Sequence, residues 1–131
     1  MVKVHVELVG CKAARRAAQR GDVTVIIDVL RASSSIVTAL SSGAEGVIPT
    51  STLKEARRLA GRYKNALLAG ERRMRKPRDF HLGNSPIEFM EGVRGRLIVL
   101  TTTDGTRAIR AAADGSRVVL VGALLNASFV A

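Results

Sequence analysis

An acidic residue and a run of serines follow one of the most apolar segments of the chain. Asp28 comes directly after Val23–Ile27, and the serine run begins at Ser33. A carboxylate at the end of a buried strand is costly unless it is paired or holds a metal ion. Hydroxyls and free N–H groups at a helix start bind anions. Asp28 is therefore a candidate metal ligand or catalytic group, or else a partner of Arg31 or an N-cap. Ser33 and Ser34 are candidate anion ligands or simple N-caps.

A second polar cluster occupies residues 101–106, where the sequence is Thr-Thr-Thr-Asp-Gly-Thr. Threonines leaving a buried strand place hydroxyl and amide groups in one turn, and Gly105 permits close backbone approach. Phosphate is the usual ligand of such a turn. The turn is not a P-loop, because the Gly-Lys-Ser/Thr ending is absent. Strand-forming threonines with a cap at Thr103 or Asp104 would give the same pattern without a ligand.

A third candidate region is the irregular stretch from residue 70 to residue 84. It begins with Glu71 and Arg72, contains a basic run, and ends at Asn84, just before a predicted helix start at Ser85 and Pro86. Connections of about fifteen residues are longer than most and are usually functional or mobile. The stretch can fold over a polyanionic ligand, or it can be a solvated basic loop.

The elements that would position these clusters alternate between strands and helices. We expect strands at residues 2–8, 23–27, 46–49, 66–69, 96–100 and 117–121, and helices at 11–20, 33–42, 52–64, 105–113, from 85 and from 125 onward. This alternation predicts a three-layer α/β/α fold with a mainly parallel or mixed sheet. Ligands of parallel sheets bind beyond the carboxyl ends of the strands, where all three clusters fall. The continuous apolar run at 23–27 predicts a strand buried on both faces.

Composition excludes several classes of protein. The chain has 131 residues, of which 47% are hydrophobic, and a single cysteine, Cys11. This hydrophobic fraction argues against disorder, and one cysteine cannot form an intrachain disulfide. No apolar run approaches the roughly 20 residues of a membrane helix, and no secretory signal begins the chain. We therefore expect a cytoplasmic protein that binds no membrane.

The charge balance has three explanations. There are 21 Lys+Arg against 11 Asp+Glu, a formal net charge of +10. Arginine-rich surfaces recognise phosphate, carboxylate or nucleic acid, and a solvated basic face is the simplest alternative. Nucleic acid is disfavoured because aromatic residues, at 3%, offer few platforms for base stacking.

Five blocks of sequence, in order along nearly the whole chain, resemble the 2-phosphosulfolactate phosphatases of coenzyme M biosynthesis. The blocks are Asp-Val-Leu-Arg-Ala-Ser at 28–33 with Ile-Val at 36–37, Leu-Ala-Gly-Glu-Arg at 68–72, Leu-Gly-Asn-Ser-Pro-Ile-Glu at 82–88, Thr-Thr-Thr-Asp-Gly-Thr at 101–106, and Leu-Asn-Ala at 125–127. Each block alone is weak, and together they are specific.

The resemblance implies a magnesium-dependent hydrolase that converts 2-phospho-3-sulfolactate into 3-sulfolactate and phosphate, with a three-layer α/β/α architecture. Magnesium would be held by the carboxylates Asp28, Glu71 and Asp104, and would assist phosphoryl transfer to water. We expect the catalytic residues to be Asp28, Arg31, Glu71 and Arg72. The expected substrate-binding residues are Ser33, Ser34, Asn84, Ser85, Thr102, Thr103, Gly105, Thr106 and Asn126.

Two features depart from that family. Its threonine turn usually has asparagine where this chain has Asp104, and its members continue well past position 131. We therefore expect residues 1–131 to be a single α/β domain or the N-terminal portion of a longer α/β enzyme, with a fold incomplete at its C-terminal end. A truncated or diverged relative that binds an anionic phosphate metabolite without turnover is the alternative function. An unfinished sheet edge would also favour a homo-oligomer.

Overall fold

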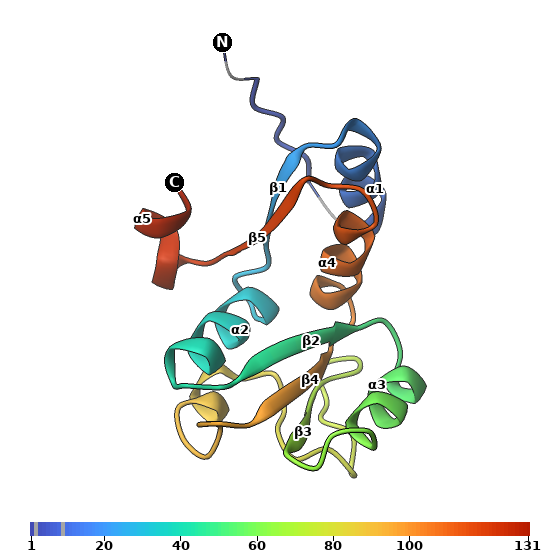
Figure 1. Cartoon of the computed structure of the whole chain (residues 1–131), viewed down its shortest axis with the longest axis vertical. Coiled ribbons are helices and arrows are strands. Elements are labelled where there is room, and N and C mark those ends of the chain that lie inside the picture. Colours follow the sequence, from blue (N-terminus) through green and yellow to red (C-terminus); the bar gives the residue numbers. More distant parts are fainter. Residues whose placement is uncertain (2, 9) are drawn as a thin grey trace.

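Helices and strands alternate along the chain in the computed structural model, which describes residues 1, 3–8 and 10–131 (Figure 1). The α-helices are α1 (Gly10–Arg20), α2 (Ala32–Ser41), α3 (Leu53–Ala60), α4 (Gly105–Ala113) and α5 (Ala127–Val130). The strands are β1 (Val23–Ile27), β2 (Gly46–Thr50), β3 (Ala66–Gly70), β4 (Leu97–Thr101) and β5 (Val118–Gly122). Two short 3-10 helices are η1 (Pro86–Phe89) and η2 (Leu124–Asn126).

The strands run parallel in two sheets. In the smaller sheet, β1 pairs with β5, from Val23 opposite Val118 to Ile27 opposite Gly122. In the larger sheet, β4 lies between β2 and β3. Parallel pairing requires crossover connections that return the chain to the same end of the sheet. These are α-helices between most successive strands, and a long loop with η1 between β3 and β4.

Alternate side chains of β4 pack against different helices. Ile98 and Leu100 lie in one apolar cluster with Ile36 of α2. Val99 points the other way and packs with Ala56 of α3. The three β4 side chains are buried, as expected for a strand covered on both faces. This helix–sheet–helix arrangement is the predicted three-layer α/β/α fold.

The smaller sheet is covered on one face. Ile26 and Val119 pack against an alanine-rich cluster of α1 and α4. On the opposite face, Val23 is 57% exposed and Ile27 is 69% exposed. The prediction that residues 23–27 are buried on both faces is therefore wrong. The physical reason is that α1 and α4 both pack on the same side of β1.

The predicted first strand at residues 2–8 is wrong for its described part. Residues 3–8 have no regular secondary structure and are exposed, while Val2 lies outside the described residues. Their alternating pattern is typical of a strand, but a strand needs a neighbour to satisfy its backbone groups. No described strand pairs with this segment.

Three predicted helices are shorter than expected. The helix expected at 52–64 is α3, which ends before Gly61 at its C-cap. The helix expected from Ser85 is the single turn η1. The predicted capping box does not form, because the Glu88 carboxylate accepts a hydrogen bond from the Gly83 N–H (2.8 Å) instead. The last predicted helix is divided into η2 and α5. Within the described residues, no helix is long and apolar enough to span a membrane.

Candidate functional site

The carboxyl ends of β2, β3 and β4 meet at Thr101. Thr101 is in register with Thr50 and Gly70, and its hydroxyl donates a hydrogen bond to the Thr50 carbonyl (3.2 Å). Gly70 has a φ of +130°, and a Cβ there would overlap the backbone of Thr101. Only glycine fits this left-handed conformation at so close an approach. The next residue, Glu71, is consequently held directly against the end of β4.

The Glu71 carboxylate is buried and hydrogen-bonded on both oxygens. Oε1 accepts from the Thr103 N–H (2.7 Å), and Oε2 accepts from the Thr103 hydroxyl (3.0 Å) and the Met74 N–H (2.8 Å). Burial alone would raise the pKa of Glu71, but these three donors and the Arg72 charge together lower its pKa below the ordinary value. Glu71 is therefore an ionised group that ties the β3 loop to the threonine turn.

The Arg72 guanidinium bridges the ends of two strands. Nη1 donates to the Glu71 carbonyl (2.8 Å), and Nη2 donates to the Ser51 carbonyl (3.1 Å) and the Thr101 hydroxyl (2.7 Å). Burial lowers the pKa of Arg72, Glu71 opposes that shift, and the charge of Arg107 adds to it. Of the five guanidinium N–H donors, two lack a protein acceptor among the described residues. These two can bind an anion.

Thr102 and Thr106 form reciprocal hydrogen bonds at the first turn of α4. The Thr102 N–H donates to the Thr106 hydroxyl (2.9 Å), and the Thr106 N–H donates to the Thr102 hydroxyl (3.1 Å). Both residues are buried. The two predicted substrate-binding side chains are thus used within the turn itself. Their role is to fix the N-terminus of α4, whose first N–H groups have no intrahelical acceptors.

The Asp28 carboxylate lies against the start of α4. A Cβ at Gly105 would overlap Asp28 Oδ2 and would lie 2.6 Å from the Ala32 Cβ, so position 105 has no room for a side chain. Burial raises the pKa of Asp28 above its ordinary value; the charges of Asp104 and Glu71 also raise it, while the backbone N–H groups of Ala32 and Arg31 oppose the shift. The charges of Asp104 and Glu71 are therefore close enough to disfavour the ionised form of Asp28.

The serines of α2 hold the chain after β1 in place. The Ser33 hydroxyl accepts from the Asp28 N–H (2.9 Å), and the Ser34 hydroxyl donates to the Val29 carbonyl (2.7 Å). The Ser35 hydroxyl donates to the backbone carbonyl of Asn84 (3.1 Å). These bonds hold the serine side chains against neighbouring loops, but they are not N-terminal caps, because the N-cap of α2 is Arg31 and makes no side-chain capping bond. They also bring the loop that carries Asn84 against α2.

Asn84 contains an unpaired buried polar atom. Its Oδ1 has no hydrogen-bond partner among the described residues, although Asn84 is only 6% exposed. A buried acceptor without a donor costs about 1–3 kcal/mol, and such groups in native proteins require an explanation. A bound water or ligand donor would satisfy this atom. Ser85, the next residue, is the N-cap of η1, and its side chain makes no capping bond.

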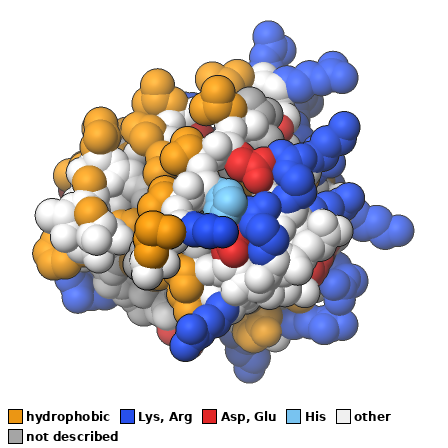
Figure 2. Space-filling model, turned by 90° about the horizontal axis from the view of Figure 1, so that it is seen from above, with side chains coloured by type: hydrophobic (Ala, Val, Ile, Leu, Met, Phe, Trp, Pro, Cys, Tyr) orange, Lys and Arg blue, Asp and Glu red, His pale blue; other side chains and the backbone are white. Residues whose placement is uncertain are grey.

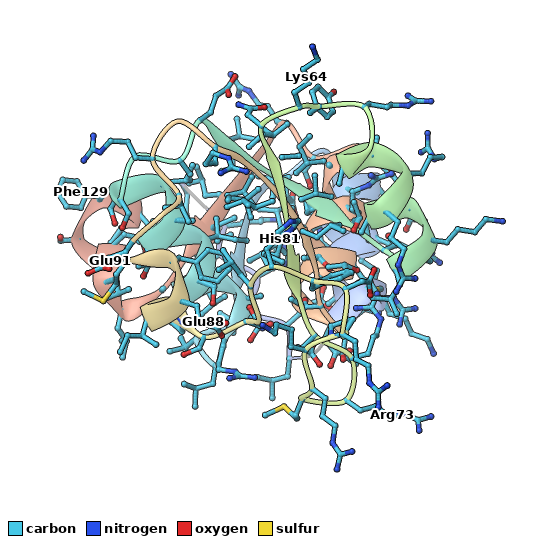
Figure 3. The ribbon with its side chains drawn as sticks, turned by 90° about the horizontal axis from the view of Figure 1, so that it is seen from below. Lys64, Arg73, His81, Glu88, Glu91 and Phe129 are labelled. Atoms are coloured by element: carbon cyan, nitrogen blue, oxygen red, sulfur yellow. The ribbon has the colours of Figure 1, made fainter. Side chains whose placement is uncertain are left out.

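The remaining predicted site residues lie at different places in the fold and differ in their exposure. Arg31 is half-buried at the N-cap of α2, and Asp104 is exposed at the N-cap of α4. Asn126 is committed to the turn after β5, where Oδ1 accepts from the Ala123 N–H (2.8 Å) and Nδ2 donates to the Val121 carbonyl (3.0 Å). The Arg73 side chain points away from the fold at the tip of its loop (Figure 3).

The carboxylates of this edge offer few free ligands for a divalent cation. In the part of the chain that the structure describes, no three His, Cys, Asp or Glu side chains form a ready metal-binding group. Glu71 Oε2 already accepts two hydrogen bonds. Asp28 and Asp104 remain, and the charge of Asp104 raises the pKa of Asp28. One or two carboxylates are the donor set that Mg²⁺ usually takes, with water and phosphate oxygens completing its shell.

Sequence reasoning missed two groups that shape this site. Thr101 provides the hydroxyl for Arg72, and Ser51 provides a carbonyl for the same guanidinium. Both follow or end predicted strands, so their position at the carboxyl edge was a usable signal. Gly70 was a further usable signal, because only glycine can lie so close to the backbone of Thr101.

The chain has helices on both faces of a parallel sheet and a polar edge formed by Asp28, Glu71, Arg72 and the threonine turn. These features define an α/β protein with a candidate site at the strand ends. The sequence profile of the 2-phosphosulpholactate phosphatase family matches residues 11–131. The chain belongs to this family.

Curated relatives agree with that assignment. A Thermotoga maritima protein named "Probable 2-phosphosulfolactate phosphatase" is 50% identical over 107 residues, which are 81% of this chain and 45% of that protein. Proteins of the same name from Caldanaerobacter subterraneus and Clostridium acetobutylicum are 49% and 42% identical, over 82% and 86% of this chain and 45% and 48% of their own lengths. The chain spans about half the length of these relatives.

Proposed function

We propose that this chain carries the phosphate-binding site of a phosphatase that converts 2-phospho-3-sulfolactate into 3-sulfolactate and inorganic phosphate. The observation that carries the proposal is the contact of the Asp28 carboxylate with Gly105 at the start of α4. It places an acidic group at the N-terminus of α4, the end of a helix where an anion is favoured. The names of the relatives, which are those of 2-phosphosulfolactate phosphatases, supply the substrate.

The proposed substrate has three anionic groups, a phosphate, a carboxylate and a sulfonate. Phosphate would bind at the N-terminus of α4, between Asp28 and the threonine turn. The two donors of Arg72 without protein acceptors, together with the half-buried Arg31, would bind the other oxyanions. Asn84 Oδ1 would accept a hydrogen bond from a water molecule or from a donor of the ligand.

In the proposed reaction, a water oxygen attacks phosphorus, and the bond between phosphorus and the ester oxygen breaks. The ester oxygen leaves as the hydroxyl group of 3-sulfolactate after taking a proton. Asp28 and Asp104 would hold Mg²⁺, which would neutralise phosphate charge during the transfer. Glu71 would act by positioning Thr103 and the turn, since its Oε2 already carries two hydrogen bonds.

The proposal is tested by phosphate release. The purified chain, with 2-phospho-3-sulfolactate and Mg²⁺, is expected to release phosphate, and chelation of the metal should stop the release. Asp28→Asn should reduce the release about 10²–10⁴-fold, while Asp114→Asn, at the exposed C-cap of α4, should leave it unchanged. Equal losses in both variants, or no effect of chelation, would contradict these roles.

The share of each relative that this chain spans favours a second candidate. The chain matches 45% of the Thermotoga maritima protein, so it can lack groups that the full-length relatives use for turnover. In this second candidate function, the chain binds the anionic metabolite without hydrolysing it. Calorimetry with the same substrate would then show binding that Asp28→Asn alters, with no phosphate release. A chain that neither binds nor hydrolyses the substrate would contradict both candidates.

The proposal places the reaction in coenzyme M biosynthesis and in the cytoplasm. Cys11 is a free thiol, and unpaired cysteines suit a reducing compartment. Measurement of 3-sulfolactate in cells with and without the gene would test the pathway. Fractionation of cells would test the location.

A further inference from the structure

One face of the β1–β5 sheet carries a continuous set of exposed apolar side chains. The register places Val23 beside Val118 and Val25 beside Leu120, so that these four side chains project from the same face, followed by Ile27. All five are exposed. We call these five residues the open face. A parallel sheet normally has both faces covered, as β4 has in the larger sheet.

The free edge of β1 adds hydrogen-bonding capacity to the open face. The only strand paired with β1 in the described chain is β5, so its other edge lacks a neighbour. A cavity of about 900 Å³ lies along β1 and is lined also by α1, α4 and residues 3–7. This space beside an unpaired strand edge suits an additional strand.

The apolar surface continues beyond β5. Leu124 and Leu125 of η2 are exposed, and Phe129 of α5 is 91% exposed. Figure 3 shows the Phe129 ring directed outward at the periphery of the fold. Seen from above, hydrophobic side chains gather on the side where α5 lies, whereas Lys and Arg gather on the opposite side (Figure 2). Contiguous exposed apolar patches of this kind mark interaction surfaces.

The lengths of the relatives indicate what covers this surface. The 107 matched residues are 45% of the Thermotoga maritima protein, so more than half of that protein lies outside the match. A second copy of the chain is a poorer occupant, because each copy carries a net charge of +10 and the two would repel.

We infer that the open face and the free edge of β1 bind the polypeptide that corresponds to the unmatched part of the relatives. In this arrangement the added polypeptide covers the five side chains of the open face and pairs with β1. Asp28, Asp104 and Gly105 also line the cavity, so the docked polypeptide closes the candidate site from that side. The inference rests on family membership and does not depend on phosphatase activity.

The test is co-expression of this chain with the unmatched part of the Thermotoga maritima relative, followed by purification through a tag on one partner. We expect a one-to-one complex by sedimentation, with slower amide hydrogen exchange at residues 23–27 and 118–122 than in the chain alone. Val118→Glu and Val25→Glu should each weaken association at least tenfold. Tyr63→Glu is the matched control, because Tyr63 and Val118 are each 44% exposed.

Three results would overturn the inference. One is the absence of any complex, and another is a complex that Val118→Glu and Tyr63→Glu affect equally. The third is self-association of the chain alone that Val118→Glu abolishes, which would identify a second copy as the occupant. Thermal unfolding of each variant alone checks its folding, and the exchange measurement on the unmodified chain decides the question if a variant fails to fold.

Discussion

The Glu71 carboxylate accepts hydrogen bonds from both donors of Thr103, the backbone N–H and the hydroxyl. The N–H of Thr103 lies 2.7 Å from Oε1, and its hydroxyl lies 3.0 Å from Oε2. Thirty-two positions separate the two residues, so this pairing joins the loop after β3 to the turn after β4. It connects two of the sequence blocks that resemble the phosphatase family, and it does so with a buried charge.

Glu71→Gln should destabilise the protein by about 1–3 kcal/mol at neutral pH, because a carboxamide replaces one acceptor oxygen with an amide donor that faces other donors. The lowered pKa of Glu71 means that its ionised form stabilises the fold above the ordinary carboxyl pKa and that this contribution is lost as the pH falls. The difference in Tm from the unmodified protein should therefore narrow below about pH 4.5. Glu91→Gln, at an exposed position, should give no such difference, and a gap independent of pH would argue against an ionised Glu71.

Gly105→Ala should destabilise the protein by about 1–3 kcal/mol and displace Asp28, because the added methyl group has no space. Ala32 lies 2.6 Å from the position of that methyl group. Gly61→Ala is the control, since Gly61 has a φ of −64° and its nearest contact would be an ordinary 3.5 Å. Chemical denaturation measures both variants. A Gly105→Ala protein as stable as Gly61→Ala would show that the contact with Asp28 is loose.

Asp28→Asn should leave the protein at least as stable as the unmodified chain at pH 7, while reducing phosphate release about 10²–10⁴-fold. Burial, with Asp104 and Glu71, raises the pKa of Asp28, so the ionised form is disfavoured in the fold. That cost appears as the pH rises from the ordinary value of 3.8 toward the raised pKa, and it is absent at lower pH. Thermal unfolding of the variant and of the unmodified chain at pH 3 and pH 7 tests the sign of this effect on stability. If the Tm of Asp28→Asn at pH 7 lies well below that of the unmodified chain, the expected effect is contradicted.

Arg72→Lys should lower stability by about 1–2 kcal/mol and raise the KM for the phosphate ester. A lysine ammonium cannot reproduce the planar fork that reaches the Glu71 carbonyl, the Ser51 carbonyl and the Thr101 hydroxyl. The matched control is Arg73→Lys, one position along, where the side chain is exposed. Calorimetric unfolding and steady-state kinetics separate the two effects. Identical KM values for the two variants would remove Arg72 from the anion site.

The order of elements and the location of the polar clusters were predictable from sequence because both depend on local patterns. Apolar runs bounded by glycine and proline indicated β1 to β5, and Asp28, Glu71 and Thr102 each fell just after one of them. Parallel connectivity then required these residues to share an edge. The roles of the individual hydroxyls were not predictable, because Ser33 and Thr106 use theirs in bonds within the turns.

The sequence by itself therefore determined which residues gather at the strand ends, since periodicity and chain direction are local properties that survive in any packing. Only the tertiary structure decided which of their polar atoms are already satisfied, that the strands divide into two sheets, and that α1 and α4 pack on one side of β1. An apolar run such as Val23–Ile27 has the same sequence whether one or both of its faces are covered. What covers a strand is set by distant segments, and in this protein that leaves the face of Val25 and Leu120 open.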